Sequence, residues 1–258
     1  MKTSQPEIIG ILTPDDLDST VVSLVEEAAR LTAAGASIIE IDTLPDGPFH
    51  AEDPDDEVDV GLLVHGLTDA GYTVAVRTTS AHIAALALER GATWIADPSG
   101  ATLDPEMGRV LSERGAHCMI GPWPAPGDPR RRGTEDENYA EGIVRNAARL
   151  LQAGVRGERI VVDSGVGARR DDPEPWRMLN HIDRLRRLGY PVLVDGCDRT
   201  LETLAPDGAT DERLDDAAVA LTLLATGARA WGIRTVRAGR VAGAIHRIFE
   251  PSTARIHQ

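Results

Sequence analysis

The sequence predicts an α/β protein that forms a single (β/α)8 TIM barrel over residues 1–258. Eight short apolar segments alternate with helical segments, and the chain has close to the roughly 250 residues typical of this barrel. Segments such as IIGIL and RIVVD are continuous β-branched runs, as expected for parallel strands buried on both faces. No linker-like segment is long enough to separate two domains. The expected strands are Ile8–Leu12, Ser37–Asp42, Thr73–Thr78, Thr93–Asp97, His117–Gly121, Arg159–Gly165, Pro191–Gly196 and Ala230–Val236.

Helix signals occupy the segments between these strands. A helix capped by Asp18 or Ser19 is expected to run to about Ala34. Another helix is expected to begin at a cap formed by Thr79 or Ser80. The helical segments PEMGRVLSERG and WRMLNHIDRLRRLG precede the fifth and the seventh strand. The recurring order of helix, glycine and apolar strand is typical of the joints between βα units.

Two segments rich in turn-forming residues are expected to be loops. Residues 45–59, PDGPFHAEDPDDEVD, follow the second strand, and their acids are expected to be solvated. Residues 121–133, GPWPAPGDPRRRG, are expected to form a loop on the face of the barrel where this fold places its active site. Arg130 to Arg132 in this loop are either solvated or in contact with an anionic ligand, and solvation is the simpler interpretation because a charge run has no fixed geometry.

The composition excludes several classes of protein. The formal net charge of −14 argues against nucleic-acid binding, which needs clustered Lys and Arg. Cys118 and Cys197 lie far apart and lack metal-ligand spacing, which fits a reducing compartment. The N-terminal residues have no signal-peptide pattern, and no run approaches the roughly 20 apolar residues of a membrane span. We therefore expect a cytoplasmic protein without nucleic-acid or membrane partners.

Six segments, in order and over nearly the whole chain, resemble the dihydropteroate synthase family. In the first half IIGILTPDD resembles GILNVTPDS, AAGASIIEIDTLP resembles AGADIIDIGGESTRP, and VAVRTTS with GATWIADPSG resembles VSVDT with GADIINDVSG. In the second half GVRGERIVVDSGVG resembles GVPPERIILDPGIG, LGYPVLVDGCDRT resembles LGYPVLVGVSRKS, and GARAWGIRTVRAG resembles GARIVRVHDV. The resemblance implies a TIM barrel and, where the site is intact, the transfer of the pterin group of a pterin pyrophosphate to p-aminobenzoate, with release of pyrophosphate.

The chain departs from this family at positions that hold its substrates. The Asn of the family's first loop, which helps to hold magnesium and pyrophosphate, is missing because Leu12 runs directly into Thr13. The Asp after the third strand and the Asn after the fourth, both pterin contacts in the family, are matched by Arg77 and Ala96. The family's pyrophosphate-binding His on the eighth strand is matched by Val236. The resemblance therefore implies that both the pterin site and the magnesium site are degraded.

Other positions keep the family's residue or related chemistry. Asp163 matches a pterin-binding carboxylate, Arg234 matches the arginine of the eighth strand, and Thr43 matches a threonine of the second loop. Arg199 takes the position of a lysine, and Cys197 that of a serine. The candidate ligand-binding residues are Thr43, Arg77, Ala96, Asp163, Cys197, Arg199 and Arg234, and no residue is assigned a catalytic role or a metal.

Two arrangements of the three arginines are open. Arg77, Arg199 and Arg234 either form an anion pocket near Asp163, or Arg77 pairs internally with Asp163 and fills the vacated pterin slot. Cys197 would be a nucleophile only if it were activated, and no His is matched to a neighbouring strand end. A small buried cysteine is the better interpretation of Cys197.

Two functions are consistent with these residues. The first is a homologue with little or no standard synthase activity that binds a small, anionic ligand. The second is an active transferase that uses a pterin pyrophosphate and p-aminobenzoate, or a related amine or anionic substrate, through a rearranged site. Magnesium is expected only if the family reaction survives. Because members of the family commonly pair through their later helices, the resemblance also implies a homodimer.

Overall fold

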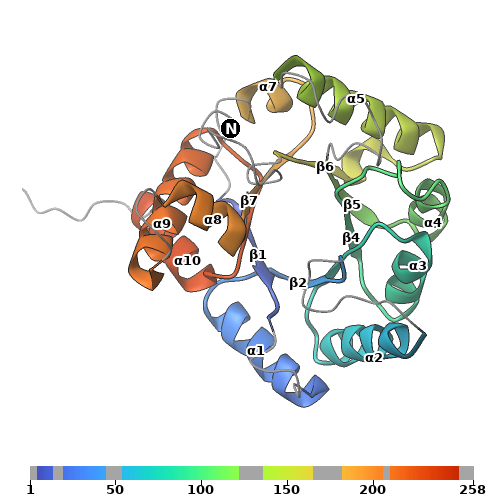
Figure 1. Cartoon of the computed structure of the whole chain (residues 1–258), viewed down its shortest axis with the longest axis horizontal. Helices are drawn as coiled ribbons and strands as arrows, with labels where there is room; N and C mark the ends of the chain where they lie inside the picture. The colour runs from blue at the N-terminus through green and yellow to red at the C-terminus, as the bar shows by residue number, and fades with distance from the viewer. Residues whose placement is uncertain are drawn as a thin grey trace, which may run out of the picture.

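Eight parallel strands form a closed barrel in the order of the sequence, and helices surround it (Figure 1). This computed structural model describes residues 5–13, 20–44, 54–121, 136–164, 182–205 and 210–249, without the side chains of residues 54–58, 136–139, 198, 199 and 203. The strands are β1 (Glu7–Ile11), β2 (Ile38–Asp42), β3 (Val74–Arg77), β4 (Trp94–Asp97), β5 (His117–Ile120), β6 (Ile160–Asp163), β7 (Val192–Gly196) and β8 (Gly232–Thr235). The predicted fold class is confirmed, and the expected strand ends differ from the observed ones by one or two residues at most.

The described helices lie outside the barrel and cover its strands (Figure 1). They are α1 (Val21–Ala33), α2 (Pro54–Asp69), α3 (Ala81–Glu89), α4 (Met107–Arg114), α5 (Asp136–Gln152), α7 (Ile182–Arg186), α8 (Asp198–Leu204), α9 (Asp211–Gly227) and α10 (Ala238–Phe249). A single 3₁₀ turn, Gly157–Arg159, precedes β6. Among the described residues, no helix has both the length and the apolar character that a membrane span requires.

Two local expectations need correction. The cap of α1 is Thr20 rather than Asp18 or Ser19, because the Thr20 hydroxyl accepts the Ser23 N–H while the Ser23 hydroxyl accepts the Thr20 N–H. The loop expected over residues 45–59 is wrong at its end, since α2 begins at Pro54. Proline is well suited to the first position of a helix, where its missing N–H leaves no bond unmade. Residues 45–53 and 122–135, with Arg130 to Arg132, lie outside the described residues.

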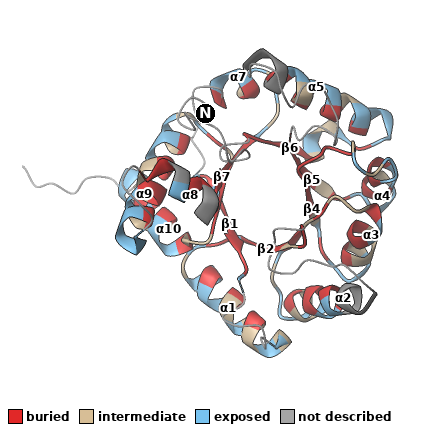
Figure 2. Cartoon of the chain, in the orientation of Figure 1, coloured by how far each residue is buried: buried red, intermediate tan, exposed pale blue. Residues whose placement is uncertain are grey.

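The core consists of two apolar layers, one on each side of the sheet. Between the strands and the helices lies a large aliphatic layer, and Figure 2 shows its buried residues along the strands and on the inner sides of the helices. A smaller layer fills the barrel interior, and its buried members are Ile9, Ile38, Ala75, Ala96, Met119, Val161 and Leu193. Because strand side chains alternate, the residues two positions further along β2, β3, β6 and β7 also face the interior. Those residues are Glu40, Arg77, Asp163 and Asp195.

A hydrogen-bonded turn fixes the chain after β4. The Asp97 carboxylate accepts the Ser99 N–H at 2.8 Å and the Ser99 hydroxyl at 2.7 Å. The side-chain amide of Asn146 on α5 donates to the carbonyl oxygens of Ser99, at 3.1 Å, and Gly121, at 2.9 Å. Gly100 lies within this turn with φ +58°, so both its backbone conformation and its close approach to Asn146 favour glycine.

We predict that Gly100→Ala destabilises the protein much more than Gly71→Ala. A Cβ at Gly100 would lie 2.5 Å from Nδ2 of Asn146, whereas a Cβ at Gly71, where φ is +89°, would meet no heavy atom of the described residues within 4 Å apart from its chain neighbours. Gly100→Ala should therefore lower the free energy of unfolding by about 3 kcal/mol or more, from strain and overlap together. Gly71→Ala should lower it by about 1 kcal/mol from strain alone. Urea denaturation measures both values, and equal losses would contradict the argument.

Candidate functional site

A buried cluster of charges centres on Arg234 of β8. Its Nη1 donates to Oδ2 of Asp163 on β6 at 2.7 Å and to Oδ2 of Asp195 on β7 at 3.2 Å. Its Nε lies 2.8 Å from Oε1 of Glu40 on β2, and its Nη2 lies 3.9 Å from the Met119 sulfur. The side chain of Arg234 is only 1% exposed. Four strands thus bring three carboxylates to one guanidinium in the barrel interior.

A second ion pair lies beside this cluster, at the end of β3. Arg77 Nη1 donates to Oδ2 of Asp42 on β2 at 2.9 Å, and both side chains are largely buried. These residues are register partners in the sheet, so their side chains leave adjacent strands on the same face. The other carboxylate oxygen of Asp42 accepts the Leu44 N–H at 3.1 Å. The Thr43 hydroxyl donates to the Arg77 carbonyl oxygen at 3.0 Å.

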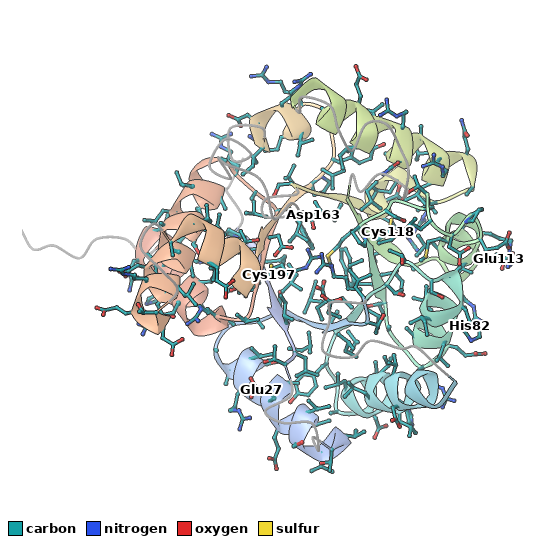
Figure 3. The ribbon with its side chains drawn as sticks, in the orientation of Figure 1. Glu27, His82, Glu113, Cys118, Asp163 and Cys197 are labelled. Atoms are coloured by element: carbon teal, nitrogen blue, oxygen red, sulfur yellow. The ribbon has the colours of Figure 1, made fainter. Side chains whose placement is uncertain are left out.

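We refer to these six charged side chains as the mouth network. Its members are Glu40, Asp42, Arg77, Asp163, Asp195 and Arg234. With four carboxylates and two guanidinium groups, the fully ionised network carries a formal charge of −2. Figure 3 shows Asp163 and Cys197 on the inner side of the ring of strands, whereas His82 lies on the outer side. The C-terminal ends of barrel strands are where this fold builds its active sites.

Two of the acids that contact Arg234, Glu40 and Asp195, have pKa values shifted in opposite directions. Burial raises the pKa of Glu40, and the charges of Arg234 and Arg77 offset only part of that effect. Burial alone would also raise the pKa of Asp195, but the charge of Arg234, together with that of Arg77 and the Cys197 N–H, lowers it instead. Among the described residues, the two carboxylate oxygens of Glu40 and the Nε of Arg234 take part in no well-aligned hydrogen bond. Glu40 therefore favours its protonated form more than Asp195 does.

The internal ion pair expected between Arg77 and Asp163 is wrong. Arg77 pairs with Asp42, and Asp163 pairs with Arg234. The reason is register: Asp42 is the cross-strand neighbour of Arg77, whereas Asp163 lies on β6, three strands away around the barrel. The alternative of three guanidinium groups available to an anion also needs revision, because two of them already bind carboxylates. The backbone of Arg199 lies in the first turn of α8, and its side chain is outside the described part of the structure.

The remaining candidate residues lie at or below the mouth network. Ala96 on β4 belongs to the interior apolar layer and offers no polar group to a ligand. Thr43 is buried and bonded to the backbone of β3. Cys197 precedes α8 and donates its backbone N–H to Oδ1 of Asp195 at 2.9 Å. Burial and the charge of Asp195 raise the pKa of the Cys197 thiol to about 12, so the thiolate is not the form present at neutral pH.

Sequence reasoning missed Glu40, Asp42 and Asp195 as members of the site. Asp42 and Asp195 both stand where the family segments quoted above have glycine. A charged residue in place of glycine at a strand end was therefore the available signal. Glu40 lies inside the apolar run IIEID and matches an aspartate of the family segment IIDIG, so an acid kept inside a buried strand was the available signal.

The described residues do not fit a magnesium site of the family type. At the end of β1 the fully buried Leu12 is followed by Thr13, so no amide or carboxylate oxygen is offered there. In the part of the chain that the structure describes, no group of three or more His, Cys, Asp or Glu side chains has an arrangement suited to a metal ion. The described residues therefore support no chemical step through magnesium.

The chain is similar to proteins of one family. The model of the family described as "Pterin binding enzyme" matches residues 15–237. A dihydropteroate synthase of Mycobacterium leprae is 28% identical over 237 residues, which covers 86% of this chain and 80% of that protein. A second protein of the same organism, "Inactive dihydropteroate synthase 2", is 30% identical over 258 residues, which covers 92% of this chain and 86% of that protein.

Two further comparisons extend the similarity. The "Probable bifunctional folylpolyglutamate synthase/dihydropteroate synthase" of Haloferax volcanii is 30% identical over 194 residues, and the match spans 72% of this chain but only 23% of that longer protein. Among solved structures, the dihydropteroate synthase of Xanthomonas albilineans in complex with 7,8-dihydropteroate has a TM-score of 0.81 at 22% identity, with 96% of this chain and 94% of that chain covered. The structural likeness supports the barrel fold.

We predict that Arg234→Met lowers the free energy of unfolding by about 3 to 5 kcal/mol, because it leaves Glu40, Asp163 and Asp195 buried without their shared cation. A matched substitution at an exposed ion pair, Arg109→Met, removes contacts to Glu106 and Glu113 and should cost no more than about 1 kcal/mol. Chemical denaturation of both variants at neutral pH measures the difference. Similar losses in the two variants would show that the mouth network does not depend on Arg234.

We also predict that Glu40→Gln becomes more stable relative to the wild type as the pH rises. The folded-state pKa of Glu40 is raised above the usual 4.5, so the folded wild-type protein holds a proton that the unfolded chain has lost. Wild-type stability therefore falls as the pH rises from 4.5 toward the folded-state pKa, and glutamine abolishes this dependence. Unfolding free energies of both proteins from about pH 5 to about pH 8 test the sign. The prediction is wrong if the stability of Glu40→Gln relative to the wild type stays constant or falls over this pH range.

Proposed function

The chain belongs to the pterin-binding enzyme family, and on that basis we propose that it is a diverged dihydropteroate synthase homologue with little or no standard synthase activity. Its barrel mouth, in this proposal, binds a small molecule other than the family's pterin pyrophosphate. The observation that carries the proposal is the Arg77–Asp42 ion pair, which stands where the family resemblance places a pterin-binding aspartate. Residues 1–258 are taken to form one domain.

Arg77 and Ala96 stand where the family has an Asp and an Asn, so hydrogen-bond acceptors are missing from the edge that would face a pterin. A guanidinium group only donates hydrogen bonds, and the methyl group of alanine neither donates nor accepts. Each ligand group left unpaired in a buried site costs about 1 to 3 kcal/mol. Two such losses weaken pterin binding by about 30-fold or more.

The leaving group is also poorly supported. A departing pyrophosphate needs a metal ion or cationic donors where its charge develops. Val236 replaces the family's histidine, and the described residues do not fit a magnesium site. Arg234 could approach a pyrophosphate only by leaving Asp163 and Asp195 without their shared cation. These contacts support a slow or absent transferase reaction.

The charge of the ligand is part of the same proposal. The sequence favours an anionic ligand through Arg77, Arg199 and Arg234. The ion pairs of Arg77 with Asp42 and of Arg234 with three acids count against this, because an anion would have to compete with carboxylates already in place. The side chain of Arg199 lies outside the described residues.

We further propose that the protein is cytoplasmic, has no nucleic-acid partner and forms a homodimer through its later helices. The formal net charge of −14 favours solubility, which supports the cytoplasmic location. The same charge should repel phosphates, which supports the absence of a nucleic-acid partner. Exposed apolar residues on the later helices support the homodimer: Leu223 and Leu224 on α9, and Ile248 on α10.

A relative described as inactive, 30% identical over most of its length, is consistent with lost catalysis in this chain.

We predict no turnover when the purified protein is mixed with a pterin pyrophosphate, p-aminobenzoate and magnesium. The dihydropteroate synthase of Mycobacterium leprae, assayed alongside, serves as the active control. Product formation at about 1 s⁻¹ or faster would overturn the proposal and favour an active transferase with a rearranged site. Titration of a pterin by calorimetry should give binding about 30-fold or more weaker than that of the control.

A further inference from the structure

Most arginine side chains in the described part of the chain pair with an acid, but five of them form neither an ion pair nor a hydrogen bond. Arg109 and Arg145, for example, bind glutamates on their own helices. The five without such a partner are Arg90, Arg159, Arg187, Arg229 and Arg247. The chain holds 41 Asp and Glu against 27 Lys and Arg, so a shortage of acids does not explain these unpaired cations.

All five lie on the face of the barrel opposite to the mouth, where helices end and strands begin. Arg90 follows α3 and precedes β4, and Arg159, Arg187 and Arg229 precede β6, β7 and β8. Arg247 lies in the last turn of α10. Arg159 is half-buried, and the other four are exposed. Free guanidinium groups are therefore arranged around the N-terminal end of the strands.

Three aromatic rings occupy the centre of the same face. Trp94 begins β4, and Trp231 directly precedes β8, on the opposite side of the closed barrel. Their ring centroids are nevertheless only 5.3 Å apart, and both rings pack against the interior apolar layer, so they meet across the barrel axis. His117, at the start of β5, stacks on Trp94 with the ring centroids 4.5 Å apart. None of the three residues is fully buried, so the centre of this face offers aromatic surface to a partner.

We refer to these five arginines and three rings as the floor face. The described acids nearest to its arginines in the sequence already bind other arginines, in the ion pairs Glu89–Arg114, Glu158–Arg156 and Asp183–Arg186. Even with Glu7 and Asp69, which lie at the same end of the barrel, the free guanidinium groups outnumber the remaining described acids. The dipole of a helix favours cations at its C-terminal end, which accounts for the place of these arginines but not for the rings beside them.

We infer that the floor face is a docking surface for a partner protein that presents separate carboxylates around an apolar side chain. Arginine and tryptophan are among the residues that most often dominate the binding energy of protein interfaces, and a guanidinium group matches the geometry of a carboxylate. Charges more than about 8 Å apart are largely screened at physiological ionic strength, so the local arginines rather than the net charge of −14 decide what binds here.

A protein partner fits this face better than a nucleic acid does. Glu89, Glu158 and Asp183 stand among the arginines, so a continuous phosphate backbone would meet carboxylates that separate side chains can avoid. The floor face lies at the opposite end of the barrel from the mouth, so binding there does not depend on the proposed function.

Two peptides of the same length test the requirement for carboxylates. One has about ten residues with Glu at alternate positions and a central Phe, and the other has Gln in place of each Glu. In titrations of the full-length protein followed by tryptophan fluorescence and calorimetry, the Glu peptide should bind with a Kd below about 1 mM and about 10-fold tighter than the Gln peptide. Equal binding of the two peptides, or no saturable binding of either up to about 5 mM, would overturn the inference.

A double charge reversal locates the binding site. Arg187→Glu combined with Arg229→Glu should weaken the Glu peptide about 10-fold, because both arginines are exposed members of the floor face. The matched control, Arg109→Glu combined with Arg145→Glu on α4 and α5, changes the net charge by the same amount and should change the affinity by less than about 3-fold. Equal weakening in the two double variants would show that only net charge matters and would overturn the assignment of the site.

Neutral substitutions keep the test valid if the charge reversal disturbs folding. Arg187→Gln combined with Arg229→Gln should weaken the Glu peptide about 3-fold, and an unchanged affinity would contradict the assignment.

Two other occupants of the floor face are tested in parallel. A single-stranded DNA of about ten nucleotides should bind no tighter than the Glu peptide. The oligomeric state measured by light scattering should be the same in the wild type and in the double charge reversal. Tighter binding of the DNA, or an oligomer that the charge reversal dissociates, would overturn the inference in favour of a nucleic acid or of a second copy of this chain.

Discussion

One buried guanidinium holds the barrel mouth together. Arg234 contacts acids from β2, β6 and β7, and removing it would take a shared buried cation away from all three of them. This requirement also specifies strand register, because a shift of one residue would turn a carboxylate from the interior into the aliphatic layer beneath the helices. The geometry of the mouth therefore follows from satisfying charges that the strands bring inside, and any ligand has to fit around that arrangement.

Each arginine of the mouth network forms an ion pair with an aspartate at the register position on the neighbouring strand. Asp42 faces Arg77 across β2 and β3, and Asp195 faces Arg234 across β7 and β8, each as a register partner. Both acids occupy positions where the resembling family segments have glycine, a residue with no side chain to pair with a cation. The arginine at position 77 thus comes with a new neighbouring acid, whereas in the second pair only Asp195 is new, because Arg234 matches the family's arginine. An aspartate restored at position 77 alone would face Asp42 as a like charge.

The fold could be predicted from the sequence because buried parallel strands leave a direct trace, a short continuous apolar run followed by a helix. The start of α2 was missed because Pro54 and its acidic neighbours resemble a turn, although proline also begins helices. The site was harder for a different reason. Motif comparison identifies which residues stand at strand ends, but ion pairs depend on register, which placed Asp42 and not Asp163 opposite Arg77. Glu40 was missed because a single acid in an apolar strand gives no sign of its partner.

Stability alone does not account for a charged barrel interior. Replacing a buried ion cluster by apolar side chains of similar volume is often neutral, or stabilising by about 1 to 4 kcal/mol. The layer immediately below, with Ile38, Ala75, Val161 and Leu193, shows that this chain can pack the same interior with aliphatic residues. Acids and arginines nevertheless fill the C-terminal end, where barrels of this fold bind their ligands. A mouth with no ligand to bind would gain from apolar packing there, so the charges at this end of the barrel support the proposed binding of a small molecule.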